Sequence, residues 1–315
     1  MKRPHLTLFW NKRKNKKINY SKTPFLKTSG LSISFHKNLF DGKELITDKK
    51  IIYIFGVVFK NNKIDYDHYL RAIDELDLTK INNCKNFFKE INGQFLFIIF
   101  DRINAKLFII NDRFNSIPIF YSNFENNFKI SHLYFDIFKD NRINKKFKIN
   151  QKNIIEFLWF RRTFGDSTYD NMSKYLLPAT ILSVDSFSLK TNIYWKPNFN
   201  RKKLNAKVAS VKLMNLIKSS SSRLTSDNKK NSIFLSAGHD SRIVLASMKK
   251  KPKCFSIGFT KNLEVNLAKK ISINQKSKFE FIKIDKDHFV KNLNFITKIS
   301  GGQYSFYDGL FAGIN

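Results

Sequence analysis

The spacing of apolar residues changes near residue 200, and this change constrains the fold more than any other feature of the sequence. Before that point, apolar stretches of strand length return in pairs joined by short turns, as in residues 94–101 and 106–110. Such pairs predict antiparallel hairpins. After that point, short apolar strands alternate with amphipathic helical segments, which predicts a parallel sheet with crossover helices. The sequence therefore predicts two domains of different fold class, residues 1–197 and 205–315.

The first domain is predicted to be an α+β domain rich in hairpins. Its expected strands are 51–60, 94–101, 106–110, 119–121, 179–184 and 190–194, and its expected helices are 65–78, 82–91 and 151–160. Asp112 and Arg113 are expected to form an internal ion pair that supports the loop before Pro118. In the second domain the expected strands are 232–235, 253–258 and 279–284, and the expected helices are 206–224, 241–248, 263–271 and 287–299.

The charge of the chain is strongly basic, with 57 Lys and Arg against 25 Asp and Glu and a net charge of +32. Lys, Asn, Ile, Phe and Tyr all have A/T-rich codons, so biased coding accounts for this composition without a polyanionic partner. The alternative is a positive field that attracts RNA, DNA or a nucleotide substrate. Because the basic clusters are short, as solvated surface clusters usually are, we expect no nucleic-acid partner.

Cysteine usage and hydropathy limit the class of protein further. Two cysteines, Cys84 and Cys254, are too few for a disulfide framework or a Cys-based zinc site. The longest apolar stretch, residues 51–59, is shorter than a bilayer span, and no apolar segment of a signal peptide follows the first residues. We therefore expect a cytoplasmic protein without a membrane segment.

The segment most informative about chemistry is S-A-G-H-D-S at residues 236–241, between an apolar strand and a helix of the second domain. At such a turn, free backbone N–H groups and the positive end of the helix dipole converge, which suits an anion. Ser236 and Ser241 add hydroxyl groups, and Gly238 can adopt a positive φ. Asp240 would repel phosphate unless it holds Mg²⁺, which bridges phosphate oxygens. The alternative is a capped helix start, with Asp240 or Ser236 as the N-cap.

This hexapeptide resembles the S-G-G-x-D-S pyrophosphate loop of the PP-loop ATP pyrophosphatases, with Ala237 in place of the second Gly. If that position needs a left-handed backbone, Ala costs about 1 kcal/mol or more. The resemblance implies ATP and Mg²⁺ as cofactors, with Asp240 as the metal ligand. The residues that it assigns to ATP and pyrophosphate are Ser236, Gly238, Asp240 and Ser241. Arg242 is a candidate contact for phosphate or substrate, or a member of an ion pair on the helix surface.

Segments outside the loop extend the resemblance to the asparagine synthetase family, over nearly the whole chain from about residue 50. They are N-G-Q-F-L-F at 92–97, N-D-R-F-N-S-I-P-I-F-Y at 111–121, L-P-A at 177–179, Y-W at 194–195 and C-F-S-I-G-F at 254–259. The resemblance implies an Ntn-type αββα amidotransferase domain followed by an α/β PP-loop (HUP-like) domain. It also implies that Leu235 and Ile257 hold adenine.

Two departures from the family limit what the resemblance implies. The family's nucleophile is a cysteine at the mature N-terminus, whereas here Met1 is followed by Lys2 and the first cysteine is Cys84. We therefore expect no catalytic residue in the first domain and no glutaminase activity. The family's synthetase domain also continues beyond the equivalent of residue 315 and includes a second glycine-rich acidic motif. We expect this chain to be incomplete at its C-terminus.

The predicted function is an asparagine-synthase-like, AMP-forming amide ligase. It would adenylate a small-molecule carboxylate, aspartate by family default, for attack by ammonia or an amine, with a homodimer as a candidate assembly. One alternative is a PP-loop enzyme acting on tRNA, which the charge favours and the β-rich first domain disfavours. The other is a non-catalytic nucleotide-binding remnant, which Ala237 and the missing nucleophile favour.

Overall fold

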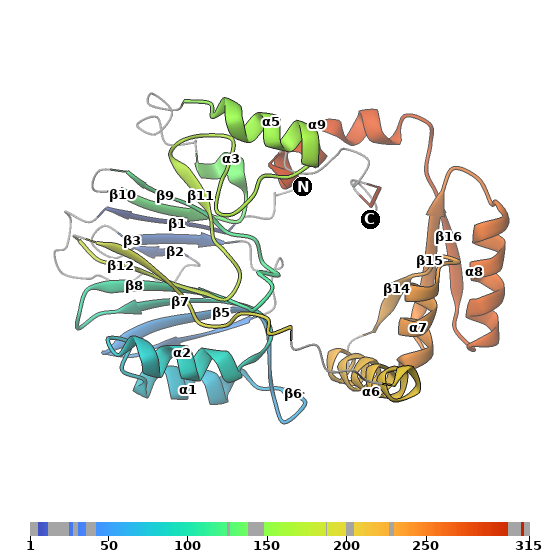
Figure 1. The fold of residues 1–315 in the computed structure, drawn as a ribbon, viewed down its shortest axis with the longest axis horizontal. Helices are drawn as coiled ribbons and strands as arrows, with labels where there is room; N and C mark the ends of the chain where they lie inside the picture. Colours follow the sequence, from blue (N-terminus) through green and yellow to red (C-terminus); the bar gives the residue numbers. More distant parts are fainter. Residues whose placement is uncertain are drawn as a thin grey trace. The chain divides into compact units, whose positions relative to one another are not determined.

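The structure is a computed structural model of the 315-residue chain. It describes residues 6–11, 25–27, 31–35, 42–124, 127–137, 148–186, 188–199, 205–226, 230–301 and 310–311. The chain divides into two compact units (Figure 1). The N-terminal unit runs to Pro197, apart from Asn61–Ile64, and also takes in the chain from Asn292 onward. The C-terminal unit consists of Asn198–Lys291 together with Asn61–Ile64.

One layer of the N-terminal unit is a six-stranded antiparallel sheet with strand order β11-β9-β10-β1-β3-β2. Its strands are β1 (Leu6–Asn11), β2 (Phe25–Lys27), β3 (Leu31–Phe35), β9 (Phe120–Phe124), β10 (Asn127–Ser131) and β11 (Ser173–Tyr175). The first three were not predicted, because short apolar runs there are separated by long Lys- and Asn-rich stretches.

The next layer is a seven-stranded sheet with order β13-β12-β8-β7-β5-β4, in which β6 pairs with β5. Its strands are β4 (Gly42–Ile46), β5 (Lys50–Lys60), β6 (Lys63–Ile64), β7 (Asn92–Asp101), β8 (Lys106–Asn111), β12 (Thr180–Val184) and β13 (Leu189–Ile193). Strand β7 pairs antiparallel with β5 on one side and β8 on the other, so the predicted hairpin forms the middle of the sheet.

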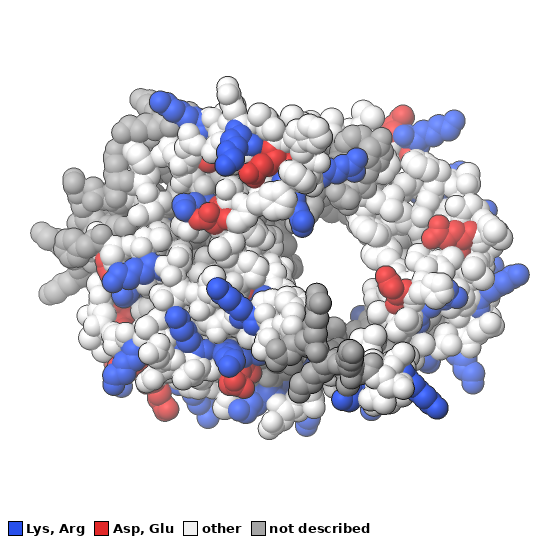
Figure 2. Space-filling view, viewed as in Figure 1, with Lys and Arg blue, Asp and Glu red and all other residues white. Residues whose placement is uncertain are grey.

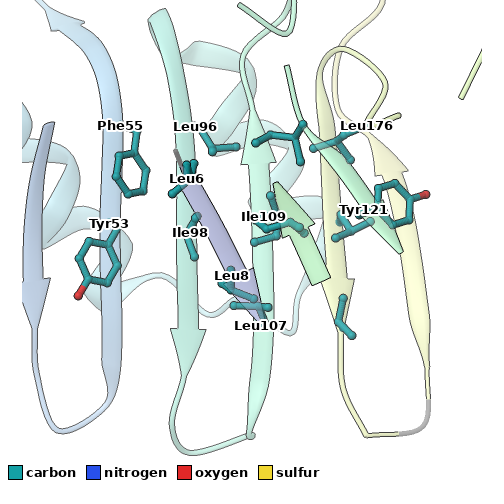
Figure 3. Close-up of a cluster of buried hydrophobic side chains, with 14 of the residues drawn as sticks. Leu6, Leu8, Tyr53, Phe55, Leu96, Ile98, Leu107, Ile109, Tyr121 and Leu176 are labelled. Carbon is teal, nitrogen blue, oxygen red and sulfur yellow. The ribbon is translucent and has the colours of Figure 1, made fainter. Parts of the chain in front are cut away.

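The two sheets pack face to face through alternate side chains of their strands (Figure 3). On β7, Ile98 and its alternate neighbours face the other sheet, whereas Phe97 faces the opposite side. Leu8 of β1 and Ile109 of β8 belong to the same buried cluster as Ile98. Burial of these apolar side chains is the main force that joins the two sheets.

Helices cover the outer face of the seven-stranded sheet. They are α1 (Tyr66–Glu75) and α2 (Ile81–Glu90). Ile73 of α1 and Phe88 of α2 are fully buried against Phe97 and its neighbours on β7. The helices present one apolar face each, because their buried residues recur at helical spacing.

The outer side of the six-stranded sheet is also covered. Here the helices are α3 (Tyr134–Ile137) and α5 (Gln151–Phe160). Tyr134 of α3 packs against Phe120 of β9, with ring centroids 5.3 Å apart. Phe157 of α5 packs against Tyr169 at 5.4 Å. The resulting helix–sheet–sheet–helix order confirms the predicted α+β sandwich.

Two glycines allow β5 and β7 to approach closely. Gly56 has φ +87°, and a Cβ built there would collide with the carbonyl oxygen of Gln94. Gly93 has φ +154°, and a Cβ there would collide with the carbonyl of Val57. A side chain at either position would separate the two strands or distort their ladder.

The C-terminal unit contains a parallel three-stranded sheet with order β14-β15-β16. Its strands are β14 (Ser232–Phe234), β15 (Lys253–Gly258) and β16 (Phe279–Lys283), and its helices are α6 (Ala206–Leu224), α7 (His239–Ser247) and α8 (Leu263–Asn274). Helix α9 (His288–Ser300) begins in this unit and continues into the N-terminal unit. The fully buried core is small and consists of Leu235, Leu245, Cys254 and Ala268.

The surface shows no gathering of one charge on the face drawn in Figure 2, where Lys and Arg are spread among neutral residues and interspersed with Asp and Glu. This distribution is typical of solvated surface charge. Within the described part of the chain, no helix has the length and apolar character that a membrane crossing requires.

Candidate functional site

The 236–241 loop joins β14 to α7 and faces solvent. Ser236, Gly238 and Asp240 are exposed, and Ser241 is half-buried. The helix begins at His239, two residues earlier than predicted, so the second half of the loop is already helical. The loop therefore presents its polar groups at the surface and at the start of a helix.

Hydrogen bonds between two serines hold the loop together. The hydroxyl oxygens of Ser236 and Ser241 lie 3.0 Å apart. The Ser241 hydroxyl donates to the Ser236 carbonyl at 3.1 Å and accepts from the Ser236 N–H at 3.2 Å. The Gly238 N–H donates to the Ser236 hydroxyl at 3.1 Å. The two hydroxyls thus lie together, and the Gly238 N–H is held by the Ser236 hydroxyl instead of being free as predicted.

The backbone of the loop differs from the expectation for Gly238. Its φ is −68° and its ψ is 161°, so the expected positive φ was wrong. Ala237 also lies outside the residues with positive φ, and it therefore carries no left-handed strain in this conformation. A Cβ at Gly238 would lie 3.1 Å from the Ser236 hydroxyl oxygen. The glycine thus allows close approach of this hydroxyl and is not needed for an unusual backbone angle.

The start of α7 lacks a capping side chain. Its N-cap is Gly238, and no side chain of the described residues caps it, so the alternative in which Asp240 or Ser236 caps the helix is not found. Four other helices begin with an Asp or Asn side chain that accepts a backbone N–H, and these caps are Asp65, Asn150, Asn205 and Asn262. Helix α2 resembles α7 in having no side-chain cap. The first N–H groups of α7 therefore remain open to an external acceptor.

Two charged side chains flank the open helix start. Asp240 lies in the first turn, is exposed, and accepts no hydrogen bond from the described residues. Arg242 is half-buried, and its Nε donates to the Gly238 carbonyl at 3.2 Å. Within the described residues, no group of three or more His, Cys, Asp or Glu side chains forms a potential metal site. Any cation at Asp240 would therefore need oxygen ligands from a bound molecule or from water.

The two residues predicted to hold adenine, Leu235 and Ile257, lie near each other, since Leu235 is hydrogen-bonded to Phe255 and Ser256. Leu235 is 2% exposed and packs in the core with Cys254 and Leu245. Its N–H donates to the Phe255 carbonyl at 2.7 Å, and its carbonyl accepts from the Ser256 hydroxyl at 2.6 Å.

Ile257 lies three residues beyond Cys254 on β15 and so belongs to the opposite face of the sheet from Cys254 and Leu235. It is half-buried. The geometry therefore gives no support to a shared adenine site made from these two side chains.

The cysteines are positioned as core residues. Cys84 of α2 is 1% exposed and packs with Phe88, and burial raises the pKa of its thiol to about 11. Cys254 is also buried and free. A protonated, inaccessible thiol is a poor nucleophile, so Cys84 is not equipped to replace an N-terminal cysteine. Residues 1–5 lie outside the described residues.

Asp112 has a role that the sequence did not predict. It is 1% exposed, and its carboxylate accepts hydrogen bonds from the N–H groups of Phe95, Phe114 and Ser116 and from the Ser116 hydroxyl, at 2.8–3.2 Å. Arg113 instead donates to the Lys89 carbonyl and lies over the Trp195 ring.

The expected ion pair between Asp112 and Arg113 was therefore wrong. A buried carboxylate is stabilised as well by several backbone N–H groups as by a guanidinium, and here the loop supplies those groups itself.

Two family models match the first part of the chain. Both are described as glutamine amidotransferase domains, one matching residues 79–195 and the other residues 16–132. Together the matched segments contain every strand of the two sheets except β1, and they contain the Asp112 loop. Neither match extends beyond residue 195.

Two proteins of known sequence are similar to parts of the chain. The chain is 32% identical over 185 residues to a glutamine-hydrolyzing asparagine synthetase 2 of Methanocaldococcus jannaschii, which covers 54% of this chain and 35% of that protein. It is also 28% identical over 132 residues to the NAD-dependent protein deacetylase Sir2B of Plasmodium falciparum, covering 41% of this chain and only 10% of that protein. The chain thus spans about a third or less of the length of these relatives.

Among solved structures, glutamine phosphoribosylpyrophosphate amidotransferase from B. subtilis, complexed with ADP and GMP, matches with a TM-score of 0.35 and 9% identity. The match covers 91% of this chain and 83% of that chain. A score this low does not define a shared fold.

Proposed function

Through its N-terminal unit this chain belongs to the asparagine-synthetase-like class II glutamine amidotransferases, and from this premise we propose that its second unit is the ATP-binding part of an AMP-forming amide ligase. In this proposal the 236–241 loop binds the β and γ phosphates of Mg²⁺-ATP. A carboxylate attacks the α-phosphate, pyrophosphate leaves, and the acyl adenylate reacts with ammonia or an amine.

The observation that carries the proposal is the uncapped start of α7. Its first N–H groups have no side-chain cap among the described residues, and they point toward the exposed loop. Phosphate is the ligand that a helix start with free N–H groups binds best, since the dipole adds to the hydrogen bonds. The hydroxyls of Ser236 and Ser241, 3.0 Å apart, lie beside these groups and can donate to phosphate oxygens after rotation.

Asp240 fits the role of a magnesium ligand in chemical terms. Mg²⁺ prefers oxygen and is usually bound through one or two carboxylates together with substrate phosphates and water. Asp240 offers one exposed carboxylate in the first turn of α7, next to the two serine hydroxyls. When bound, the ion would neutralise phosphate charge.

The chain's own contribution to the reaction would be to orient the nucleotide and stabilise the leaving group. Fixed N–H and hydroxyl donors favour the charge that develops on the leaving pyrophosphate, and they need little rearrangement during the reaction. Gly238 lets the backbone approach the phosphates, because a side chain there would press on Ser236.

The proposal includes the absence of glutaminase activity from this chain. Cys84 and Cys254 are both buried, and the Cys84 thiol is protonated at neutral pH. The nitrogen donor would then be free ammonia or an amine. An assay for ammonia release from glutamine tests this part of the proposal separately.

The decisive experiment titrates Mg²⁺-ATP against the full chain and compares two matched variants. Asp240→Asn and Glu264→Gln each remove one exposed carboxylate from the first turn of a helix in the same unit. We expect Asp240→Asn to weaken Mg²⁺-ATP binding by about tenfold or more, which corresponds to about 1.4 kcal/mol. We expect Glu264→Gln to leave binding unchanged.

Equal weakening by both variants, or no binding of Mg²⁺-ATP to the full chain, would overturn the proposal. ATP–pyrophosphate exchange then separates catalysis from binding. Binding without exchange favours the non-catalytic nucleotide-binding alternative, which the small core of the C-terminal unit also favours.

A further inference from the structure

A pocket of about 360 Å³ opens on the N-terminal unit, next to β9, β11 and the β12–β13 hairpin. Its volume lies in the range of small-molecule sites. The residues of its lining on which the argument depends are Tyr121, Asp166, Leu176, Leu177, Ile193 and Lys196. The geometry points to a binding site for a small amino-acid zwitterion, with Tyr121 and Asp166 receiving the ammonium group and Lys196 receiving the carboxylate. This site is separate from the proposed nucleotide loop.

Tyr121 lines the pocket with a side chain whose ring is buried in the core. Its side chain is 5% exposed and packs against Phe128 in the core between the sheets. Figure 3 shows its hydroxyl oxygen pointing away from that cluster. Among the described residues, no hydrogen-bond partner of this hydroxyl is found. The Tyr121 hydroxyl is not one of the fully buried polar atoms that lack a partner, so it is accessible from the pocket and can bind a ligand or water there.

Asp166 adds negative charge at the same place. One carboxylate oxygen, Oδ2, lies 2.6 Å from the Lys174 ammonium in an exposed ion pair, and Oδ1 has no partner among the described residues. Burial, and secondly the charge of Asp166, raise the pKa of Tyr121 to about 12. Tyr121 is therefore a neutral phenol at physiological pH and sits close enough to sense Asp166. A neutral hydroxyl next to a carboxylate suits a ligand with several N–H donors.

The other lining residues suit the aliphatic side chain and the carboxylate of the ligand. Leu176, Leu177 and Ile193 give apolar walls that suit an aliphatic side chain. Lys196, just after β13, is exposed and has no ion-pair partner among the described residues. Its ammonium group is therefore available for a carboxylate. Charge of both signs around an apolar wall is the pattern expected for an amino acid that carries an aliphatic side chain.

Three matched probes test the assignment by ligand-observed NMR titration of the full chain. L-Leucine carries both charges, 3-methylbutylamine lacks only the carboxylate, and 4-methylpentanoate lacks only the amine. We expect saturable binding of leucine and at least about threefold weaker binding of each of the other two, since each loses one charged contact. Tyr121→Phe, which removes only the hydroxyl, is expected to weaken leucine binding about two- to tenfold.

Two charge variants assign the ends of the ligand. Asp166→Asn should abolish the preference for leucine over 4-methylpentanoate, and Lys196→Met should abolish the preference for leucine over 3-methylbutylamine. Lys190→Met, on β13 but outside the pocket, should change neither preference. Tryptophan fluorescence confirms that each variant is folded. The assignment is overturned if leucine shows no saturable binding up to about 10 mM, or if Tyr121→Phe and Asp166→Asn bind leucine as the unmodified chain does.

Discussion

Two aspartates show how differently the two units use polar side chains. Asp112 in the N-terminal unit is 1% exposed and accepts four hydrogen bonds from its own loop and from β7. Asp240 in the C-terminal unit is exposed and accepts none from the described residues. The same chemical group therefore stabilises the fold in one unit and remains available to a ligand in the other.

The two units also differ in how many apolar side chains they bury. The N-terminal unit buries one large cluster between its sheets and another beneath α1 and α2. Among the described residues of the C-terminal unit, the buried cluster has four side chains, with Met248, Val265 and Ile284 buried outside it, and α6 leaves Leu213 and Leu216 more than half exposed. Since buried apolar area is the main source of stability, the N-terminal unit should be the more stable of the two.

The largest effect is expected from truncating the core of the N-terminal unit. Phe97 is fully buried on β7, with its ring 4.8 Å from that of Phe95 and 5.6 Å from that of Phe88. Phe97→Ala should lower the free energy of unfolding of this unit by about 3–5 kcal/mol. All three tryptophans, at positions 10, 159 and 195, lie in this unit. Tryptophan fluorescence during urea unfolding therefore measures it alone.

The matched control is Phe234→Ala on β14 of the C-terminal unit. Phe234 is 47% exposed, so its removal should change stability by less than about 1 kcal/mol. That change should be visible by far-ultraviolet circular dichroism and not by fluorescence. Similar losses in the free energy of unfolding for the two variants would contradict the expectation that the N-terminal unit has the more stable core.

This difference explains which parts of the fold could be predicted from sequence. The β7–β8 hairpin is buried on both faces, so its strands are continuous apolar runs that a local pattern detects. Strands β1 to β3 are short and bear alternating polar residues, and long Lys- and Asn-rich segments separate them. Strands β2 and β3 join the sheet through β1, and β1 pairs with β10 more than 100 residues away, as between Leu8 and Ile130, which a local pattern does not contain.

The candidate site shows the same limit. The strand–loop–helix context of Ser236 and Ser241 is local, and the structure brings their hydroxyls together as predicted. The partners of Asp112 include the N–H of Phe95, 17 residues earlier, so sequence neighbours suggested the wrong ion pair. The pocket beside Tyr121 combines four separate segments of the chain and had no local signal. Non-local contacts, not residue types, were the missing information.

A smaller effect is expected from exchanging the two aspartates for alanine. Asp112→Ala leaves buried N–H groups without an acceptor and should cost about 2–3 kcal/mol in the free energy of unfolding, measured by fluorescence in urea. Asp112→Asn keeps one acceptor oxygen and should cost less. Asp240→Ala should change the unfolding of the C-terminal unit, followed by circular dichroism, by no more than about 0.5 kcal/mol. A large loss for Asp240→Ala would give Asp240 a structural role and remove the contrast between the two carboxylates.

The smallest effect is expected for the two buried cysteines, which should react with a thiol reagent at different urea concentrations. Both thiols are fully buried in the folded chain, Cys84 at 1% exposure and Cys254 at 0%, so static exposure predicts no difference between them. Their surroundings do differ, because Cys84 packs in a large cluster and Cys254 in a core of four side chains.

Pulse labelling with a thiol reagent at pH 8 across a urea series should therefore modify Cys254 at lower urea than Cys84. The expected difference in opening free energy is at least about 1 kcal/mol. Peptide mass spectrometry assigns each label, and Cys84→Ala and Cys254→Ala identify the two signals. Labelling of both thiols at the same urea concentration would mean that the two units unfold together. The C-terminal unit would then be stabilised by the N-terminal unit.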